Sequence, residues 1–357
     1  MMARVMTLVC TAAMLMLSSS APAAAADEPD GAHYESFQPS GAAGVLHYYV
    51  SQTPGAPTHA LVAIHGHPRD ANKTFEAAMT AAQNADRLGD TLIVAPVFQV
   101  AGPEARECET RGVPKARDGD LSWTCESWLE GGLASNDATF GSFDALDAIL
   151  AELTRRWPSL RSVTVAGFSA GGQMVQHYIG FAADQGGVTQ RFVVADPGIW
   201  LYFDPDRPQP LQQGRPADWS VCSAPDVSSC AFGFAPGPPD CADGNRWKYG
   251  TDGMPAHFKR SAAEARLHYA KATIRYLEGA LDSGEGKGTY YRILDKSCAA
   301  EAQGPYRLQR GLAYAAYDRA RLATHGDRHV TLISGCAHDV ACVFPSDAAR
   351  AALFDGP

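Results

Sequence analysis

Short apolar runs alternate with helical patterns along most of the chain. Residues 59–64 and 91–95 each form a mostly apolar run of strand length, and between them apolar residues recur at helical spacing from Phe75 to Ala82. The same alternation returns further along, with helical patterns expected at 143–157 and 174–179 and strands at 162–166 and 192–195. Strand and helix in repeated order predict an α/β fold, with a mainly parallel central sheet and helices on both faces.

The second half of the chain continues this order after an interruption. Residues 199–258 are rich in Pro, Trp and Gly, and we expect them to form an inserted cap. Residues 98–142 are expected to be a long loop, of the kind that often carries function. The remaining helical patterns and strands are expected at 262–269, 272–277, 308–322 and 330–333.

The beginning of the chain has a different pattern. Arg4 precedes an almost wholly apolar run from Val5 to Leu17, and a stretch of small residues ends at Ala26. The run is shorter than the roughly 20 residues that a spanning helix needs. The pattern therefore predicts a secretory signal peptide at residues 1–26, a secreted or periplasmic protein, and no stable membrane anchor.

The cysteines support the same expectation. Of nine cysteines, only Cys10 lies in the predicted signal peptide, and the even number that remains suggests disulfides in an exported chain. Cys108 with Cys125 and Cys336 with Cys342 are plausible local pairs, while the other pairings stay open. No cysteine spacing fits a zinc site.

The charge balance argues against one class of partner. The chain carries 30 Lys and Arg against 39 Asp and Glu, a net charge of -9, and has no basic cluster. Nucleic-acid binding needs a concentrated basic patch, so we expect no nucleic-acid partner.

A Gly-Phe-Ser-Ala-Gly sequence joins the expected strand at 162–166 to the helix that follows it. Small residues at Gly167 and Gly171 allow a tight strand-to-helix turn that exposes the serine between them. Ser169 is therefore the candidate nucleophile, and a merely structural turn is the alternative.

A serine hydroxyl needs a base to activate it. His338 follows the last expected strand in a Gly-x-x-His turn, which makes it the candidate base. His177 lies within a helical pattern, and His325 and His329 precede the strand, so these three are expected to be surface or core histidines.

The base in turn needs a carboxylate to orient it. Asp282 follows the strand at 272–277 in a Gly-x-x-Asp turn and is the favoured candidate. Asp295 follows a short apolar pair and stays open as the rival. A carboxylate that only caps a turn is the third interpretation.

Two backbone N–H groups are needed to stabilise an oxyanion. The residue after the serine, Ala170, would supply one, and His67 in the His-Gly-His-Pro turn after residues 59–64 would supply the other. Binding of a metal by His65 and His67 is the alternative interpretation, but no third ligand is evident nearby. We expect no metal and no cofactor.

Several aromatic residues follow strand ends. They are expected either to line an apolar substrate pocket or to form the core of the cap, and the sequence does not decide between these interpretations. They are Trp123, Trp128, Trp200, Tyr202 and Phe203.

Taken in order, these motifs resemble the α/β-hydrolase superfamily, which has an H-G-x-P turn, a G-x-S-x-G elbow, a G-x-x-D acid and a G-x-x-H base. The resemblance covers roughly residues 59–344. It implies an eight-stranded, mostly parallel sheet, with residues 27–357 as the catalytic domain and residues 199–258 as a cap insertion. It also implies hydrolysis of an ester or a related acyl compound without a cofactor.

The resemblance leaves the substrate open, because the superfamily also contains peptidases, lactonases, polyester hydrolases and lyases. A small-molecule or polymeric ester is the favoured substrate, and a peptide or amide is the alternative. A binding protein on the same scaffold is the second class of function, and it would predict a missing member of the triad.

Overall fold

The computed structural model describes residues 28–52, 55–222, 227, 230–323 and 328–354. The predicted signal peptide therefore lies outside the described residues, as does His325. No helix in the described part of the chain is long and apolar enough to cross a membrane.

An eight-stranded sheet in the order β1-β2-β4-β3-β9-β10-β14-β15 forms the centre of the molecule. Every neighbouring pair from β4 to β15 is parallel, whereas β1 and β2 run antiparallel to their neighbours. The predicted mainly parallel sheet is confirmed. The strands are Ala32–Phe37 (β1), Leu46–Ser51 (β2), His59–Ile64 (β3), Thr91–Val97 (β4), Ser162–Phe168 (β9), Thr189–Ala195 (β10), Ile274–Gly279 (β14) and Val330–Ile333 (β15).

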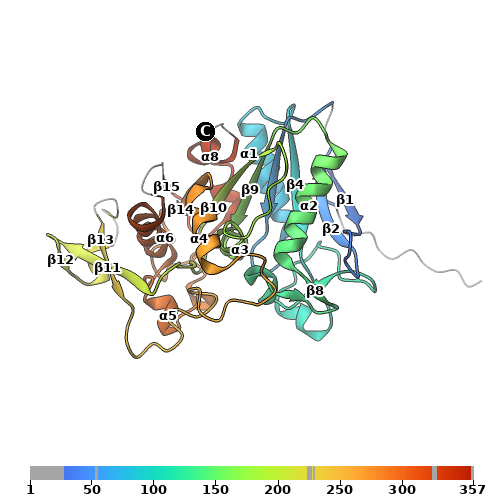
Figure 1. The fold of residues 1–357 in the computed structure, drawn as a ribbon. Coiled ribbons are helices and arrows are strands. Elements are labelled where there is room, and N and C mark those ends of the chain that lie inside the picture. Colours follow the sequence, from blue (N-terminus) through green and yellow to red (C-terminus); the bar gives the residue numbers. More distant parts are fainter. Residues whose placement is uncertain (1–27, 53–54, 223–226, 228–229, 324–327, 355–357) are drawn as a thin grey trace, which may run out of the picture.

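Helices cover both faces of the sheet, as Figure 1 shows. Successive residues of a strand point to opposite faces, so Val62 packs in one hydrophobic cluster with α2, α3, α4 and α6, while Leu61 packs in another with α1, α7 and α8. The helices are Ala71–Asn84 (α1), Ser142–Arg156 (α2), Ala170–Tyr178 (α3), Ala262–Lys271 (α4), Cys298–Glu301 (α5), Arg307–Tyr317 (α6), Val340–Val343 (α7) and Arg350–Phe354 (α8). A π-helical turn, Asp318–Leu322, extends α6 over the rest of the expected 308–322 helix.

Two irregular segments lie where the sequence pattern is interrupted. The expected loop at 98–142 contains short strands and two 3-10 helical turns, Pro103–Glu107 and Ser127–Glu130. The segment at 199–258 contains a three-stranded antiparallel sheet that projects from the body of the molecule (Figure 1). The short strands are Gln99–Val100 (β5), Ser122–Trp123 (β6), Leu133–Ala134 (β7), Asp137–Gly141 (β8), Asp206–Gln212 (β11), Arg215–Pro216 (β12) and Ala231–Pro236 (β13).

Disulfides close loops at the carboxyl edge of the sheet and in the projecting segment. The two expected local pairs, Cys108–Cys125 and Cys336–Cys342, are both present. Two further pairs that the sequence left open, Cys222–Cys230 and Cys241–Cys298, tie parts of the projecting segment to each other and to α5.

Candidate active site

Ser169 lies in a sharp turn between β9 and α3. Its backbone has φ 58° and ψ -121°, a combination that is costly for any residue with a side chain. The turn depends on its glycines, because a Cβ at Gly167 would lie 2.0 Å from the carbonyl oxygen of Gly171. A Cβ at Gly171 would lie 2.3 Å from the carbonyl oxygen of Ile64 in β3. Close packing of strand, turn and helix therefore holds the serine in this strained position.

Three sequence-predicted residues meet at this turn. The Nε2 atom of His338 lies 2.7 Å from the hydroxyl oxygen of Ser169, and its Nδ1 atom lies 2.8 Å from a carboxyl oxygen of Asp282. Asp282 comes from the turn after β14 and His338 from the turn after β15, and both are almost fully buried. The structure thus joins Ser, His and Asp by an unbroken chain of hydrogen bonds.

The surroundings of His338 favour the neutral imidazole. Burial is the largest influence lowering its pKa, and the positive charge of Arg307 lowers the pKa further, while Asp282 acts in the opposite direction. When the Nδ1–H group donates a hydrogen bond to Asp282, the lone pair of Nε2 faces the Ser169 hydroxyl. A neutral imidazole in this tautomer can accept the serine proton.

A buried arginine that sequence reasoning missed supports the carboxylate. Arg307 begins α6, donates to the backbone carbonyl of Thr289 at 2.6 Å, and lies 3.4 Å from the second carboxyl oxygen of Asp282. Its position results from the packing of α6 against β14, so no local motif marks it.

The rival carboxylate has other partners. Asp295 accepts hydrogen bonds from the Tyr249 hydroxyl at 2.6 Å and from the Ser297 backbone at 2.9 Å, and it lies 3.5 Å from the Lys248 ammonium. The structure therefore brings Asp282, and not Asp295, to the imidazole of His338.

The other histidines serve the fold or lie at the surface. Both ring nitrogens of the buried His177 lie 2.8 Å from backbone carbonyls, and His329 is exposed. His65 donates from Nδ1 to the Gly66 carbonyl at 2.9 Å and accepts the Phe98 N–H at Nε2. Burial lowers the pKa of His65 to about 3, and both its nitrogens are engaged, so the alternative of a His65–His67 metal pair finds no support.

One group of side chains has the composition of a metal site. Donor atoms of Asp196, Asp282 and His338 lie within 4.8 Å of one another, and all three residues are buried. However, both nitrogens of His338 already have partners in Ser169 and Asp282. The arrangement fits a hydrogen-bonded acid and base better than a set of metal ligands.

Two pockets meet at Ser169. The pocket that we name the His338 pocket has a volume of about 620 Å³ and contains His338. The pocket that we name the Ala170 pocket has a volume of about 630 Å³ and contains Ala170 and Gln173. Ser169, His67, Pro68 and Ile293 line both.

Both pockets combine apolar and charged side chains in their walls. The His338 pocket has apolar side chains from Ala77, Phe168, Tyr290, Ile293, Val340, Ala341 and Pro345, and charged ones from Asp70, Lys73, Glu76 and Asp339. The Ala170 pocket has four carboxylates and two cations in its wall, from Glu107, Glu126, Glu130, Asp295, Lys248 and Arg307. Carboxylates outnumber cations in both pockets, so a substrate bound across Ser169 would meet acidic groups on either side.

Both expected oxyanion donors lie at this junction. Ala170 is the first residue of α3, so its N–H belongs to the electropositive end of that helix, and His67 follows β3 in the neighbouring turn. Both residues line the Ala170 pocket together with Ser169.

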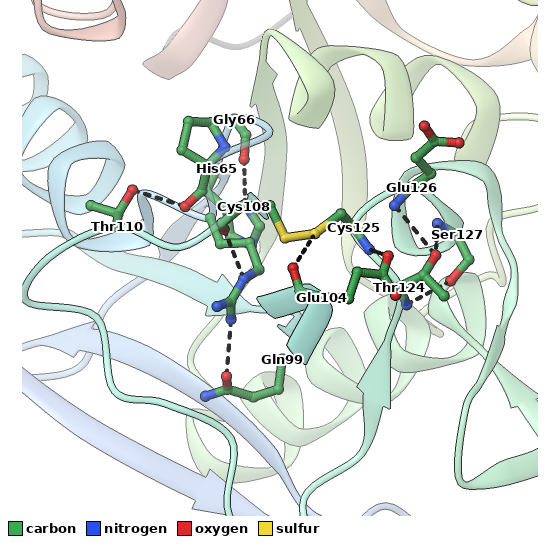
Figure 2. The surroundings of a disulfide bond; sticks show 12 residues. His65, Gly66, Gln99, Glu104, Cys108, Thr110, Thr124, Cys125, Glu126 and Ser127 are labelled. Atoms are coloured by element: carbon green, nitrogen blue, oxygen red, sulfur yellow. Dashed lines mark hydrogen bonds between the residues drawn. A yellow bond between two sulfur atoms is a disulfide. The ribbon is translucent and has the colours of Figure 1, made fainter. Parts of the chain in front are cut away.

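The Cys108–Cys125 disulfide, whose surroundings Figure 2 shows, joins two segments that line the Ala170 pocket. Glu107 and Glu126, two of the acidic residues in the pocket wall, each adjoin one of its cysteines. Arg69 ties this loop to the turn after β3 by donating to the Cys108 carbonyl at 3.0 Å. The disulfide therefore holds two carboxylates near the candidate nucleophile.

The aromatic residues expected near a pocket lie elsewhere. The side chains of Trp123, Trp128, Trp200 and Tyr202 are at most 1% exposed and belong to the main hydrophobic cluster, and none lines either pocket at Ser169. The interpretation of these residues as pocket lining was wrong for this structure, because strand-end aromatics point into the packed layers beside the sheet. The aromatic residues at the site are Phe168 and Tyr290.

Comparison with known proteins finds similarity in structure. No protein-family model matches the sequence, and none of the curated proteins matches it. Poly(aspartic acid) hydrolase-1 from Sphingomonas sp. KT-1 has a TM-score of 0.56 at 17% identity, covering 91% of this chain and 99% of that one. The poly(3-hydroxybutyrate) depolymerase LpqC from Bordetella parapertussis has a TM-score of 0.56 at 18% identity, covering 89% of each chain. Together with the strand order and the turn at Ser169, these similarities show that this chain has the α/β-hydrolase fold.

Proposed function

We propose that this protein is an exported hydrolase of carboxylic esters that uses Ser169 as nucleophile, His338 as general base and acid, and Asp282 as the orienting carboxylate. The observation that supports this most is the hydrogen-bond chain from Asp282 through His338 to Ser169, which ends at a strained, pocket-facing serine.

The reaction follows from the placement of these groups. Ser169 attacks the ester carbonyl carbon while Nε2 of His338 takes its proton, and the resulting oxyanion is stabilised by the N–H groups of His67 and Ala170. His338 then gives the proton to the departing alcohol oxygen as the carbon–oxygen bond breaks. Water repeats these steps on the acyl-enzyme and releases the acid.

The position of the base assigns a role to each pocket. His338 must reach the oxygen of the leaving alcohol, so the alcohol occupies the His338 pocket. The acyl group then occupies the Ala170 pocket, where carboxylates outnumber cations. We therefore expect neutral acyl groups to be preferred over anionic ones, because an anion would be repelled there.

This expectation separates the protein from one of its structural neighbours. One neighbour is a hydrolase of poly(aspartic acid) and the other a depolymerase of poly(3-hydroxybutyrate). A polyanion would be disfavoured by the acidic Ala170 pocket, whereas a neutral polyester is compatible with both pockets. Among polymeric substrates, a neutral polyester is therefore the favoured candidate.

Export is proposed on the cysteines. Four disulfides join residues of the described chain, and disulfides form and persist in oxidising compartments. A secreted or periplasmic location follows, in agreement with the expected signal peptide.

The test uses three p-nitrophenyl or p-nitroanilide substrates of similar acyl size. For the protein with its disulfides formed, kcat/KM for the neutral p-nitrophenyl butyrate is expected to exceed that for anionic p-nitrophenyl hemisuccinate by about 10-fold or more, because carboxylates in the Ala170 pocket repel the anion. Neutralising the pocket rim in the Glu107→Gln/Glu126→Gln double variant should narrow this ratio. The exposed Glu285→Gln, which lines neither pocket, serves as control.

Two results would change the proposal. Faster cleavage of butyryl p-nitroanilide than of the ester would favour a peptidase or amidase that uses the same residues. Absence of turnover on all three substrates by correctly oxidised protein would move weight to a binding protein on a hydrolase scaffold.

A further inference from the structure

Two buried carboxyl side chains lie beside the triad and take no part in the mechanism described above. Asp196 follows β10 directly, Glu278 lies in the neighbouring strand β14, and both are 0% exposed. Buried carboxyl groups are costly unless they are paired or hydrogen-bonded, so their presence here needs a reason.

Asp196 holds the turn that carries the triad acid. One of its carboxyl oxygens accepts the Gly279 N–H at 2.8 Å. The Gly279 carbonyl in turn accepts the Asp282 N–H at 2.9 Å. Moving Asp196 would therefore move the backbone from which Asp282 reaches His338.

The remaining carboxyl oxygens of Asp196 and Glu278 lie close to each other. Among the described residues, no donor meets the second oxygen of Asp196 or either oxygen of Glu278, and the two carboxyl groups are within hydrogen-bonding reach of one another. Two carboxylates in contact repel each other, whereas one proton between them forms a hydrogen bond.

The packing keeps the pair together. A Cβ on Gly311 of α6 would lie 2.0 Å from an oxygen of Glu278, so the helix closes directly over this carboxyl group. Burial is the main cause that raises the pKa of both carboxyl groups, so the pair retains a proton. The Gly279 N–H lowers the pKa of Asp196 and so favours Asp196 as the ionised member of the pair.

Three other charged or titratable groups face the pair. Asp282 raises the pKa of both carboxyl groups, and Arg307 from α6 lowers both. His338 is the third group, because one of its ring nitrogens lies within 4.8 Å of a carboxyl oxygen of Asp196. Arg307 lowers the pKa of His338, while Asp282 and Asp70 raise it. A negative charge on Asp196 at this distance in a buried site would likewise favour the protonated imidazole.

We propose that Asp196 and Glu278 share one proton, and that the pair, with its single negative charge, positions the Gly279–Asp282 turn and stabilises protonated His338 during the reaction. Both residues are positioning residues, since neither touches Ser169 or the pockets. The inference rests on the proposed function only in so far as His338 is the catalytic base.

Amide substitutions test how many negative charges the pair of Asp196 and Glu278 carries. In Asp196→Asn or Glu278→Gln, the new amide supplies the donor that the shared proton supplied, and one negative charge remains. The double variant Asp196→Asn/Glu278→Gln has no charge. The readout is the acidic limb of the pH profile of kcat/KM for p-nitrophenyl butyrate, which reports the pKa of the base in the free enzyme.

The expected shifts follow from the sign of the charge. Protonated His338 is inactive as a base, so activity rises as pH rises through its pKa. Removing a negative charge lowers that pKa and moves the limb to lower pH. Each single variant should stay within about 0.3 pH unit of the native protein, and the double variant should shift downward by about one unit. Asp347→Asn, at a side chain 95% exposed, controls for general effects.

Two outcomes would overturn the proposal. A downward shift in both single variants would mean that both carboxyl groups are ionised. An unchanged limb in a folded double variant would mean that the pair is neutral or does not act on His338.

Infrared difference spectra give a readout that needs no activity. At neutral pH, subtracting the spectrum of either single variant from that of the native protein should leave the band of one protonated carboxyl group. Presence of this band without ester hydrolysis would separate failure of the proposed function from failure of the shared proton. Absence of the band would contradict the shared proton itself.

Discussion

The two halves of the candidate site are built in different ways. The nucleophile half consists of β9, the turn at Ser169 and α3, which are contiguous in sequence. Its geometry is set by close backbone packing, with Gly167 against Gly171 and Gly171 against Ile64. The serine is therefore placed by one contiguous segment and its backbone contact with the neighbouring strand β3.

The acid–base half is assembled from distant segments. Asp282 and His338 come from different turns, the His338 N–H donates to the Gly288 carbonyl at 3.1 Å, and Arg307 reaches in from α6. The Cys336–Cys342 disulfide closes the turn that carries the histidine. This half depends on side-chain contacts, so we expect its mutations to affect catalysis more than folding.

The largest expected effect is in the acid–base half. Asp282→Asn should lower kcat for p-nitrophenyl butyrate by about 10³- to 10⁴-fold, because an amide can hold the imidazole in the wrong tautomer. The unfolding free energy, measured by urea denaturation, should change by much less than the activation free energy of the reaction. Asp295 is the rival carboxylate, and Asp295→Asn should lower kcat by less than about 10-fold. A larger loss of kcat in Asp295→Asn than in Asp282→Asn would reverse the assignment of the acid.

In the nucleophile half, the expected effect is a smaller change, and it is in the unfolding free energy. Gly171→Val should lower the unfolding free energy by about 2–4 kcal/mol or prevent folding, because its side chain would enter the space of the Ile64 carbonyl. Gly89→Ala is the matched control, since a Cβ there meets nothing within 4 Å. Equal stability of the two variants would show that the turn is less tightly packed than described.

The local half of the site could be predicted from sequence. The run at 59–64 and the run at 330–333 coincide with β3 and β15, and the Gly-x-Ser-x-Gly spacing identified the turn at Ser169. Patterns of this kind are local, because buried strands and tight turns constrain the residues that form them.

The edge strands were not predicted. β1 has only partly buried positions along most of its length, and β2 is buried but contains His, Tyr and Ser, so neither has the apolar pattern of the inner strands. An antiparallel pair at the edge of a sheet can be built from such residues because one side remains partly solvated.

The supporting groups of the acid–base half could be found only in three dimensions. Asp282 and Asp295 both follow short apolar runs, and only the fold shows which one reaches His338. Asp196 also follows an apolar strand and could have been considered on that signal, whereas Arg307 and Glu278 depend on the packing of α6 against β14. Side-chain direction likewise decided that the predicted tryptophans belong to the core.

The most direct test of the central claim is covalent labelling by a fluorophosphonate, followed by mass spectrometry of the labelled peptide. We predict one label, on Ser169, with loss of ester hydrolysis in proportion to labelling. Ser169→Ala should take up no label. His338→Ala should react with the fluorophosphonate at least about 10³-fold more slowly than the native protein. Ester hydrolysis that persists in Ser169→Ala, or a label on another residue that abolishes activity, would contradict the account.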